Sequence, residues 1–167
     1  MSEEPRDILK TIPFFSEVLT PDELDELAVR AYFIEWPKGA TPIEEDGPGR
    51  SMFVIASGEA DVTVHGDDEP VARLGRGAIV GEMSLLTGAR RAATVTAATN
   101  VEAIEINKAA LAHVLKSSPT LVDRFAALID KRQRDLHRAA GDGAWGMIRP
   151  GKAEMAATIR AFFSKAI

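Results

Sequence analysis

The hydrophobic and polar positions along the chain change their spacing twice, which divides it into a helical part, a part rich in strands and a second helical part. In residues 8–31 the apolar positions recur at helical spacing. The segment Thr20-Pro21-Asp22-Glu23 is typical of a helix start, because it offers a threonine N-cap, a proline in the first turn and a glutamate that completes a capping box. We therefore predict short leading helices packed on a core.

Residues 32–107 follow the shorter spacing of strands. Runs of β-branched and apolar residues alternate there with turns of Gly, Pro and Asp. Many short strands at regular spacing favour an antiparallel sandwich or barrel, and the segment has no room for the crossover helices of a parallel sheet. The predicted strands are 32–36, 41–45, 52–57, 60–65, 71–74, 92–98 and 101–106.

The rest of the chain is predicted to be helical. Residues 81–88 read as one or two turns of helix inserted among the strands, opened by an acidic residue and closed by glycine. Asn107 can cap a helix from Lys108 to Lys116, and Ser118-Pro119 starts a longer helix that ends at Ala140. The tail contains a glycine-rich break and then a short helix over 152–164. This organisation gives a leading helical segment (1–31), a strand-rich core (32–107), trailing helices (108–140) and a tail (141–167).

Composition narrows the class of protein. The 167 residues are 46% hydrophobic and 27% charged, which is ordinary for one globular domain. The absence of cysteine excludes disulfides, thiolate metal sites and cysteine nucleophiles. The net charge of −5 disfavours electrostatic binding to nucleic acid, no apolar run approaches the roughly 20 residues of a membrane span, and the polar N-terminus does not look like a signal peptide. We expect a cytoplasmic domain with small or protein partners.

Catalytic and metal chemistry find little support in the sequence. No G-x-S-x-G motif marks a nucleophile. The three histidines, His65, His113 and His137, fall on different predicted elements, so they do not form a metal-binding cluster. We expect neither an enzyme nor a metal site.

The stretch 80–94, VGEMSLLTGARRAAT, has the features of a pocket for an anion that also carries a hydroxyl group. The start of a short helix offers free N–H groups, and Gly81 allows a ligand to approach the backbone. An arginine in the return loop can bind a phosphate, and Glu82 can accept a hydrogen bond from a ribose hydroxyl. The residues therefore predict a nucleotide-like ligand.

This stretch resembles the phosphate-binding cassette of the cyclic nucleotide-binding domain family. The matching residues are Gly81, Glu82, Met83, Ser84, Leu85 and Leu86, followed by Arg91, Ala92, Ala93, Thr94 and Val95. The resemblance covers about residues 8–138 and implies an α+β, mainly β fold. That fold is an eight-stranded antiparallel, jelly-roll-like β-roll with leading helices, a short cassette helix and trailing hinge and lid helices.

The resemblance also implies roles for single residues. Arg91 would pair with the cyclic phosphate, Glu82 would bind the ribose 2′-OH, and Gly81 would lie against the ribose. Backbone N–H groups near Ser84 and Ala92 would complete the phosphate cradle, while Arg90 would face solvent.

Base preference and lid closure rest on two further positions. In the family, Thr or Ser directly after the cassette arginine favours cGMP, and Ala92 has no side-chain hydrogen-bonding group, so cAMP is the expected ligand and cGMP a weaker one. Arg132 falls within the apolar stripe of the last long helix. It is interpreted either as an arginine whose head reaches out from the edge of the stripe or as a lid residue that meets the purine base.

Three alternatives remain for the protein or process that ligand binding would regulate. The similarity of GEMSLLTG and ATVTAAT to prokaryotic cyclic-nucleotide-gated channels favours an ion-channel effector. The others are the sensor part of a truncated transcription regulator and a stand-alone cAMP-binding regulatory protein. No DNA contact and no membrane span are expected from this chain. Residues 1–50 hold 5 basic and 12 acidic residues, so most of the negative charge lies in this part of the chain. The cassette and the last long helix carry arginines, where an anionic ligand would lie.

Overall fold

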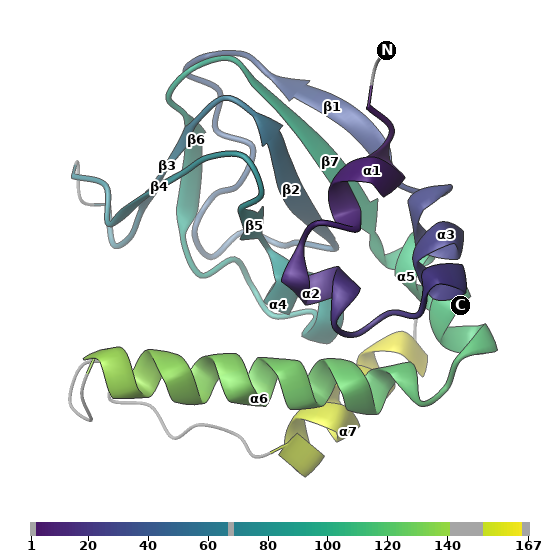
Figure 1. Ribbon diagram of the computed structural model, residues 1–167. Helices are drawn as coiled ribbons and strands as arrows, with labels where there is room; N and C mark the ends of the chain where they lie inside the picture. The colour runs from purple at the N-terminus through teal and green to yellow at the C-terminus, as the bar shows by residue number, and fades with distance from the viewer. Residues whose placement is uncertain (1–2, 67–68, 141–151, 165–167) are drawn as a thin grey trace.

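The computed structural model describes residues 3–66, 69–140 and 152–164, with side chains in the longest helix described as far as Lys131. Two antiparallel sheets form a roll with helices packed against it (Figure 1). One sheet has the order β1-β7-β2-β5 and the other the order β4-β3-β6. The strands are β1 (Tyr32–Trp36), β2 (Ser51–Ser57), β3 (Ala60–Thr63), β4 (Ala72–Leu74), β5 (Ile79–Val80), β6 (Thr94–Ala97) and β7 (Val101–Asn107).

The expected mainly β roll with flanking helices is confirmed, but its strands differ from the expectation in number and extent. The described residues contain seven strands rather than eight. The predicted strand 41–45 is wrong: only Ile43 makes an isolated bridge there, to Val95. Pro42 has no N–H to donate, so a continuous ladder cannot form through this segment. The sequence also missed β5, whose two residues are too few to show a period.

Two helices begin where their capping residues predicted, whereas α6 begins at Leu121, after the expected Ser118-Pro119 start. The side chain of Thr20 accepts from the N–H of Glu23 and Glu23 returns a bond to the N–H of Thr20, so α3 (Pro21–Ala28) starts with a full capping box. Asn107 Oδ1 accepts from the N–H of Ala110 at 2.8 Å and starts α5 (Lys108–Ser117). The other helices are α1 (Pro5–Leu9), α2 (Pro13–Ser16), α4 (Glu82–Thr87), α6 (Leu121–Ala140) and α7 (Lys152–Ser164).

Strand β2 separates two hydrophobic cores because successive side chains of a strand point to opposite faces. Met52 and Val54 pack toward the helices, in a cluster that includes the buried phenylalanines of α2. Phe53 and Ile55 face the inside of the roll, where they join Trp36. The helical core fixes α6 on the roll, and the inner core supports the strands around the cassette.

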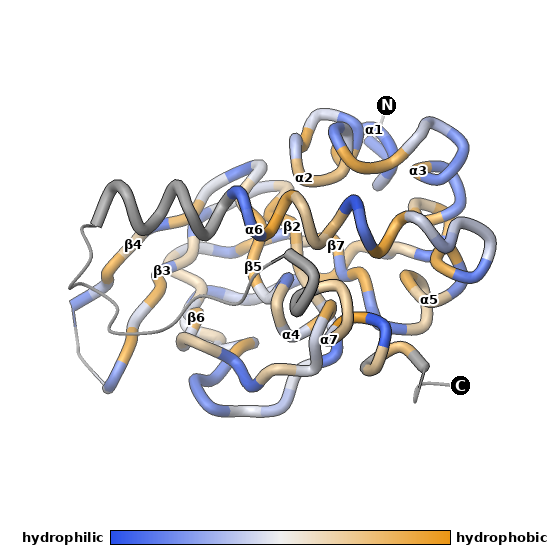
Figure 2. The backbone as a smooth tube through the Cα atoms, turned by 90° about the horizontal axis from the view of Figure 1, so that it is seen from below, coloured by the Kyte–Doolittle hydropathy of each residue, from blue (hydrophilic) through white to orange (hydrophobic). Residues whose placement is uncertain are grey.

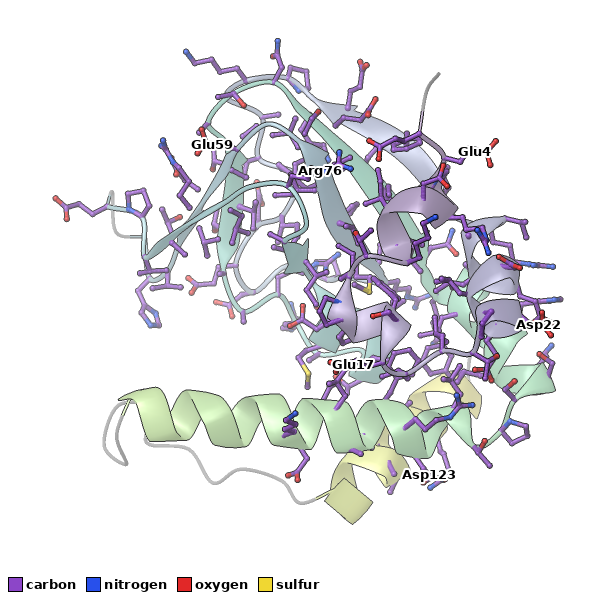
Figure 3. The ribbon with its side chains drawn as sticks, in the orientation of Figure 1. Glu4, Glu17, Asp22, Glu59, Arg76 and Asp123 are labelled. Carbon is purple, nitrogen blue, oxygen red and sulfur yellow. The ribbon has the colours of Figure 1, made fainter. Side chains whose placement is uncertain are left out.

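The long helix α6 runs beneath the roll, with α4 above it and α7 beside it (Figure 1). Seen from below, hydrophobic and hydrophilic residues alternate along the first part of α6, as expected for a helix with one buried face (Figure 2). Helix α7 packs on both α6 and α4, with Ile159 fully buried and Phe163 8% exposed. On its outer side Arg160 donates to Asp123 of α6 at 2.7 Å, and Asp123 is labelled in Figure 3. None of the helices in the described part of the chain has the length and apolar character needed to cross a membrane.

Candidate functional site

A cavity of about 280 Å³ lies where the cassette meets the inner face of the roll. Its polar side is formed by the start of α4 and by the return segment before β6. Its apolar side includes Val62 of β3 and Leu74 of β4. Six of the seven residues predicted as ligand-binding line this one cavity: Gly81, Glu82, Met83, Ser84, Arg91 and Ala92.

Arg91 is a buried cation at the centre of the site. The whole residue is only 8% exposed. Its guanidinium lies 5.9 Å from the ring centroid of Phe53. Nη1 donates to the main-chain oxygen of Ser51 at 2.8 Å and to that of Gly81 at 3.5 Å. Burial lowers the pKa of Arg91, while the charges of Glu105 and Glu82 act in the opposite direction. No carboxylate of the described chain lies within ion-pairing distance of Arg91, so its charge is met only by distant groups and carbonyl dipoles.

The loop before β2 clamps the backbone of Arg91. The N–H of Arg91 donates to the oxygen of Gly47 at 2.9 Å, and the N–H of Asp46 donates back to the oxygen of Arg91 at 2.8 Å. Arg90 is exposed but also lines the cavity, which the sequence did not lead us to expect, and its Nη1 donates to the oxygen of Asp46 at 2.7 Å. Asp46 itself has φ 65°, which few residues without a short polar side chain adopt. The backbone of Arg91 is therefore held at both its N–H and its carbonyl group by the loop before β2.

Two glycines make room for the guanidinium from opposite elements. A Cβ at Gly81 would overlap Nη1 of Arg91, and a Cβ at Gly49 would overlap its Nε and Cζ. Gly81 also has φ 84°, a left-handed conformation that glycine adopts without strain. Arg91 thus lies in a slot that only side-chain-free residues leave open.

Main-chain N–H groups without a main-chain partner belong to lining residues in both halves of the cassette. Gly81 caps α4, so the N–H groups of Glu82, Met83 and Ser84 in its first turn have no partner inside the helix. In the return segment, no described main-chain oxygen accepts from the N–H of Ala92. Ser84 is 3% exposed and Glu82 is half-buried, so the α4 side of the cavity is largely withdrawn from solvent.

The proposed lid residue is not placed by the structure. The side chain of Arg132 lies outside the described residues, and no described residue of α6 lines the cavity. A neighbouring cavity of about 480 Å³ is lined by Leu128 of α6 and shares Leu74 and Ile79 with the first. The described part of α6 therefore borders the cavity next to the candidate site and not the site itself.

Sequence reasoning missed three contributors to the site: Gly49, Ser51 and Glu105. Gly49 lies in a turn-rich stretch of Gly and Pro, which hides that a glycine can also mark a close approach of other atoms to the backbone. Ser51 contributes its main-chain oxygen, which any residue carries, so no side-chain signal could have found it. Among the described residues no group of three potential metal ligands comes together.

Comparison with known proteins decides the family. Residues 33–118 match the family model described as "Cyclic nucleotide-binding domain". The chain belongs to the cyclic nucleotide-binding domain family. The matched range of this cyclic nucleotide-binding domain includes residues 80–94, which form one side of the cavity described above.

The relatives of this cyclic nucleotide-binding domain are of different kinds. A cAMP-dependent protein kinase regulatory subunit of Colletotrichum orbiculare is 35% identical over 109 residues, which are 65% of this chain and 28% of the relative. A cyclic nucleotide-gated potassium channel of Mesorhizobium japonicum is 35% identical over 120 residues, 71% of this chain and 32% of the channel. The chain thus spans about a third of the length of these relatives.

A solved structure extends the likeness beyond the matched range. The N-terminal domain of a transcriptional regulator from Streptomyces coelicolor is 25% identical and superposes with a TM-score of 0.68. The superposition covers 84% of this chain and 100% of that domain. Kinase regulation, channel gating and transcription are therefore all represented among the relatives of this domain.

Proposed function

We propose that this cyclic nucleotide-binding domain is a regulatory cAMP sensor. The observation that carries the proposal is Arg91, a buried cation without a carboxylate partner among the described residues, at a cavity lined by the cassette. A buried charge is costly unless a counter-charge meets it, and a cyclic phosphate would supply that charge. Glu82 would accept from the ribose 2′-OH, and the free N–H groups of α4 and the return segment would donate to phosphate oxygens.

The preference for cAMP over cGMP rests on Ala92, which is exposed at the rim of the cavity and carries no hydrogen-bonding side chain. The domain therefore lacks a side-chain partner for the guanine amino group at this position. The kinase-subunit relatives are named as parts of cAMP-dependent kinases, which points the same way. We propose no catalytic role, since phosphate and ribose contacts alone explain the site.

The mechanism that we propose keeps the roll rigid and moves helices. Residues 32–107 would hold the ligand, the leading segment 1–31 and the trailing helices 108–140 would shift, and Arg132 would bring α6 onto the base. Ligand can bias such a shift only through its different affinity for the two arrangements. The tail 141–167 contributes α7, which contacts the cassette helix and α6 together and would register a change in either.

An ion channel is the effector that we propose first, because the channel relative aligns over a larger part of this chain than the kinase subunit does. A kinase-type catalytic partner is the second candidate, because the kinase subunits match with equal identity. We propose the cytoplasm as the location, which suits a chain without cysteine.

Parallel calorimetric titrations with cAMP and cGMP test the ligand. We expect cAMP to bind more tightly, and Arg91→Ala to weaken cAMP binding by about 30- to 1,000-fold, because one partner of a buried charge pair is removed. Arg30→Ala is the matched control, since Arg30 is exposed at the end of α3, where Nη1 donates to the oxygen of Glu26. Binding of neither nucleotide, or wild-type affinity in Arg91→Ala, would contradict the proposal.

A further inference from the structure

Glu105 is linked to the cassette arginine although it does not line the cavity. It lies on β7, directly opposite Tyr32 of β1 and Phe53 of β2. Its Oε2 accepts from the hydroxyl of Tyr32 at 2.5 Å and from the hydroxyl of Ser51 at 3.1 Å. The main-chain oxygen of the same Ser51 accepts from Arg91. A chain of hydrogen bonds therefore runs from an exposed tyrosine through a carboxylate and a serine to the buried guanidinium.

The carboxylate is held in place by two hydroxyl donors, and no described hydrogen bond joins it to the guanidinium of Arg91. No ion pair joins Glu105 to Arg91 among the described contacts, so the two charges interact at a distance. The charge of Glu105 raises the pKa of Arg91 more than the charge of Glu82 does. In a partly buried region such an attraction is screened less than at the surface.

We propose that Glu105 is a positioning residue for Arg91, which holds the guanidinium between Ser51 and Gly81 and limits the affinity of the site for a cyclic phosphate. This inference rests on the proposed function. A bound phosphate brings a second negative charge to Arg91, and that charge is repelled by Glu105. The domain thus keeps its buried arginine ordered when empty, at the expense of ligand affinity.

Glu105→Gln separates charge from hydrogen bonding, because a glutamine oxygen can still accept from Tyr32 and Ser51. We expect this variant to bind cAMP about fivefold more tightly than wild type, an effect of the size given by one charge at a distance of several ångströms in a partly screened site. The gain should shrink as salt is added, since salt screens the removed repulsion. A residue with only a structural role would lower the affinity or leave it unchanged.

Glu102→Gln is the matched control. Glu102 lies on the same strand, is exposed, and is paired across the sheet with Glu35 and Ser57, away from the arginine. It makes the same change in net charge, so we expect wild-type affinity. An equal gain in both variants would reduce the effect to overall charge and overturn the proposal, as would unchanged or weaker binding in Glu105→Gln.

A second measurement needs no ligand. The Nε–H signal of Arg91 in ¹⁵N NMR, assigned by its loss in Arg91→Ala, should move and exchange faster with water in Glu105→Gln but not in Glu102→Gln. Identical signals in wild type, Glu105→Gln and Glu102→Gln would overturn the positioning role. If wild type bound no cyclic nucleotide, the proposed function would fail, while this comparison would still decide whether Glu105 positions Arg91.

Discussion

Arg91 and its neighbours illustrate which single residues a sequence can and cannot assign. The cassette residues occur in a contiguous pattern, so their convergence on one cavity was predictable. The guanidinium of Arg91 donates to Ser51 at the start of β2, 40 residues away in the sequence, and its N–H donates to Gly47 in the loop before β2. Glu105 of β7 is linked to Arg91 through Ser51. Such contacts depend on how sheets pair, and no local spacing encodes them.

Ala92 gives a prediction at the same scale. Ala92→Thr places a hydroxyl directly after the cassette arginine, where the base of a bound nucleotide would lie under the proposed function. We expect cGMP affinity to rise by about three- to tenfold, as for one added hydrogen bond, with cAMP affinity within twofold of wild type. Competition binding with both nucleotides measures the ratio. An unchanged ratio would mean that Ala92 does not set the preference.

Among the elements, those with a capping residue or an uninterrupted period were predictable and the others were not. Strand β1 and helix α7 have the bounds that the pattern gave. Strand β3 ends at Thr63, two residues early, because His65 (φ 56°) and Gly66 (φ 72°) turn the chain there. The role of α7 was also hidden, because an amphipathic stretch does not say which helices it will contact.

The junction between α3 and α6 depends on one ion pair. Glu23 and Arg124 form a two-bond contact at 2.8 Å for each bond, and Arg124 also donates to the oxygen of Val18. The hydrogen bonds from Arg124 are the main cause that lowers the pKa of Glu23 from 4.5 to about 2. The pair ties the leading helices to the start of the longest trailing helix.

This pair makes folding stability depend on pH. A carboxyl whose pKa is lowered by folding stabilises the native state above its unfolded pKa, and that contribution is lost as pH falls from about 4.5 to about 2. We expect Glu23→Gln to be less stable than wild type at neutral pH by about 1–2 kcal/mol, allowing for partial exposure of Arg124, with the difference fading in acid. Urea unfolding across this pH range measures it.

Glu17→Gln is the control for that experiment, because Glu17 is exposed on the neighbouring turn. Its stability should follow the wild-type pH profile. A difference between wild type and Glu23→Gln that stayed constant in acid would show that the substitution perturbs packing and not the ionised pair.

For the molecule as a whole, charge is distributed unevenly over the fold. The leading helices present acidic side chains, among them Glu4, Glu17 and Asp22, labelled in Figure 3. The cassette holds its arginine inside. An anionic ligand would therefore meet a local positive charge on a chain whose total charge is −5.

Hydrogen exchange tests the proposed movement at this scale. If cAMP draws α6 onto the pocket, amides over 132–140 should become more protected when ligand is added, because lid closure stabilises that end of the helix. The amides of β2 and β7 should change little, since these strands belong to the rigid support. Unchanged protection along α6 at saturating cAMP would contradict the lid, whatever the affinity.

The glycine slot around Arg91 has a consequence for reading related sequences. A substitution at position 49 or 81 would displace the guanidinium without altering the arginine itself. Loss of binding during divergence could therefore start at a glycine, and the arginine would remain as a relic. Whether a homologue can bind a cyclic nucleotide should therefore be judged from positions 49, 81 and 91 together, although the glycines at the first two carry no functional group.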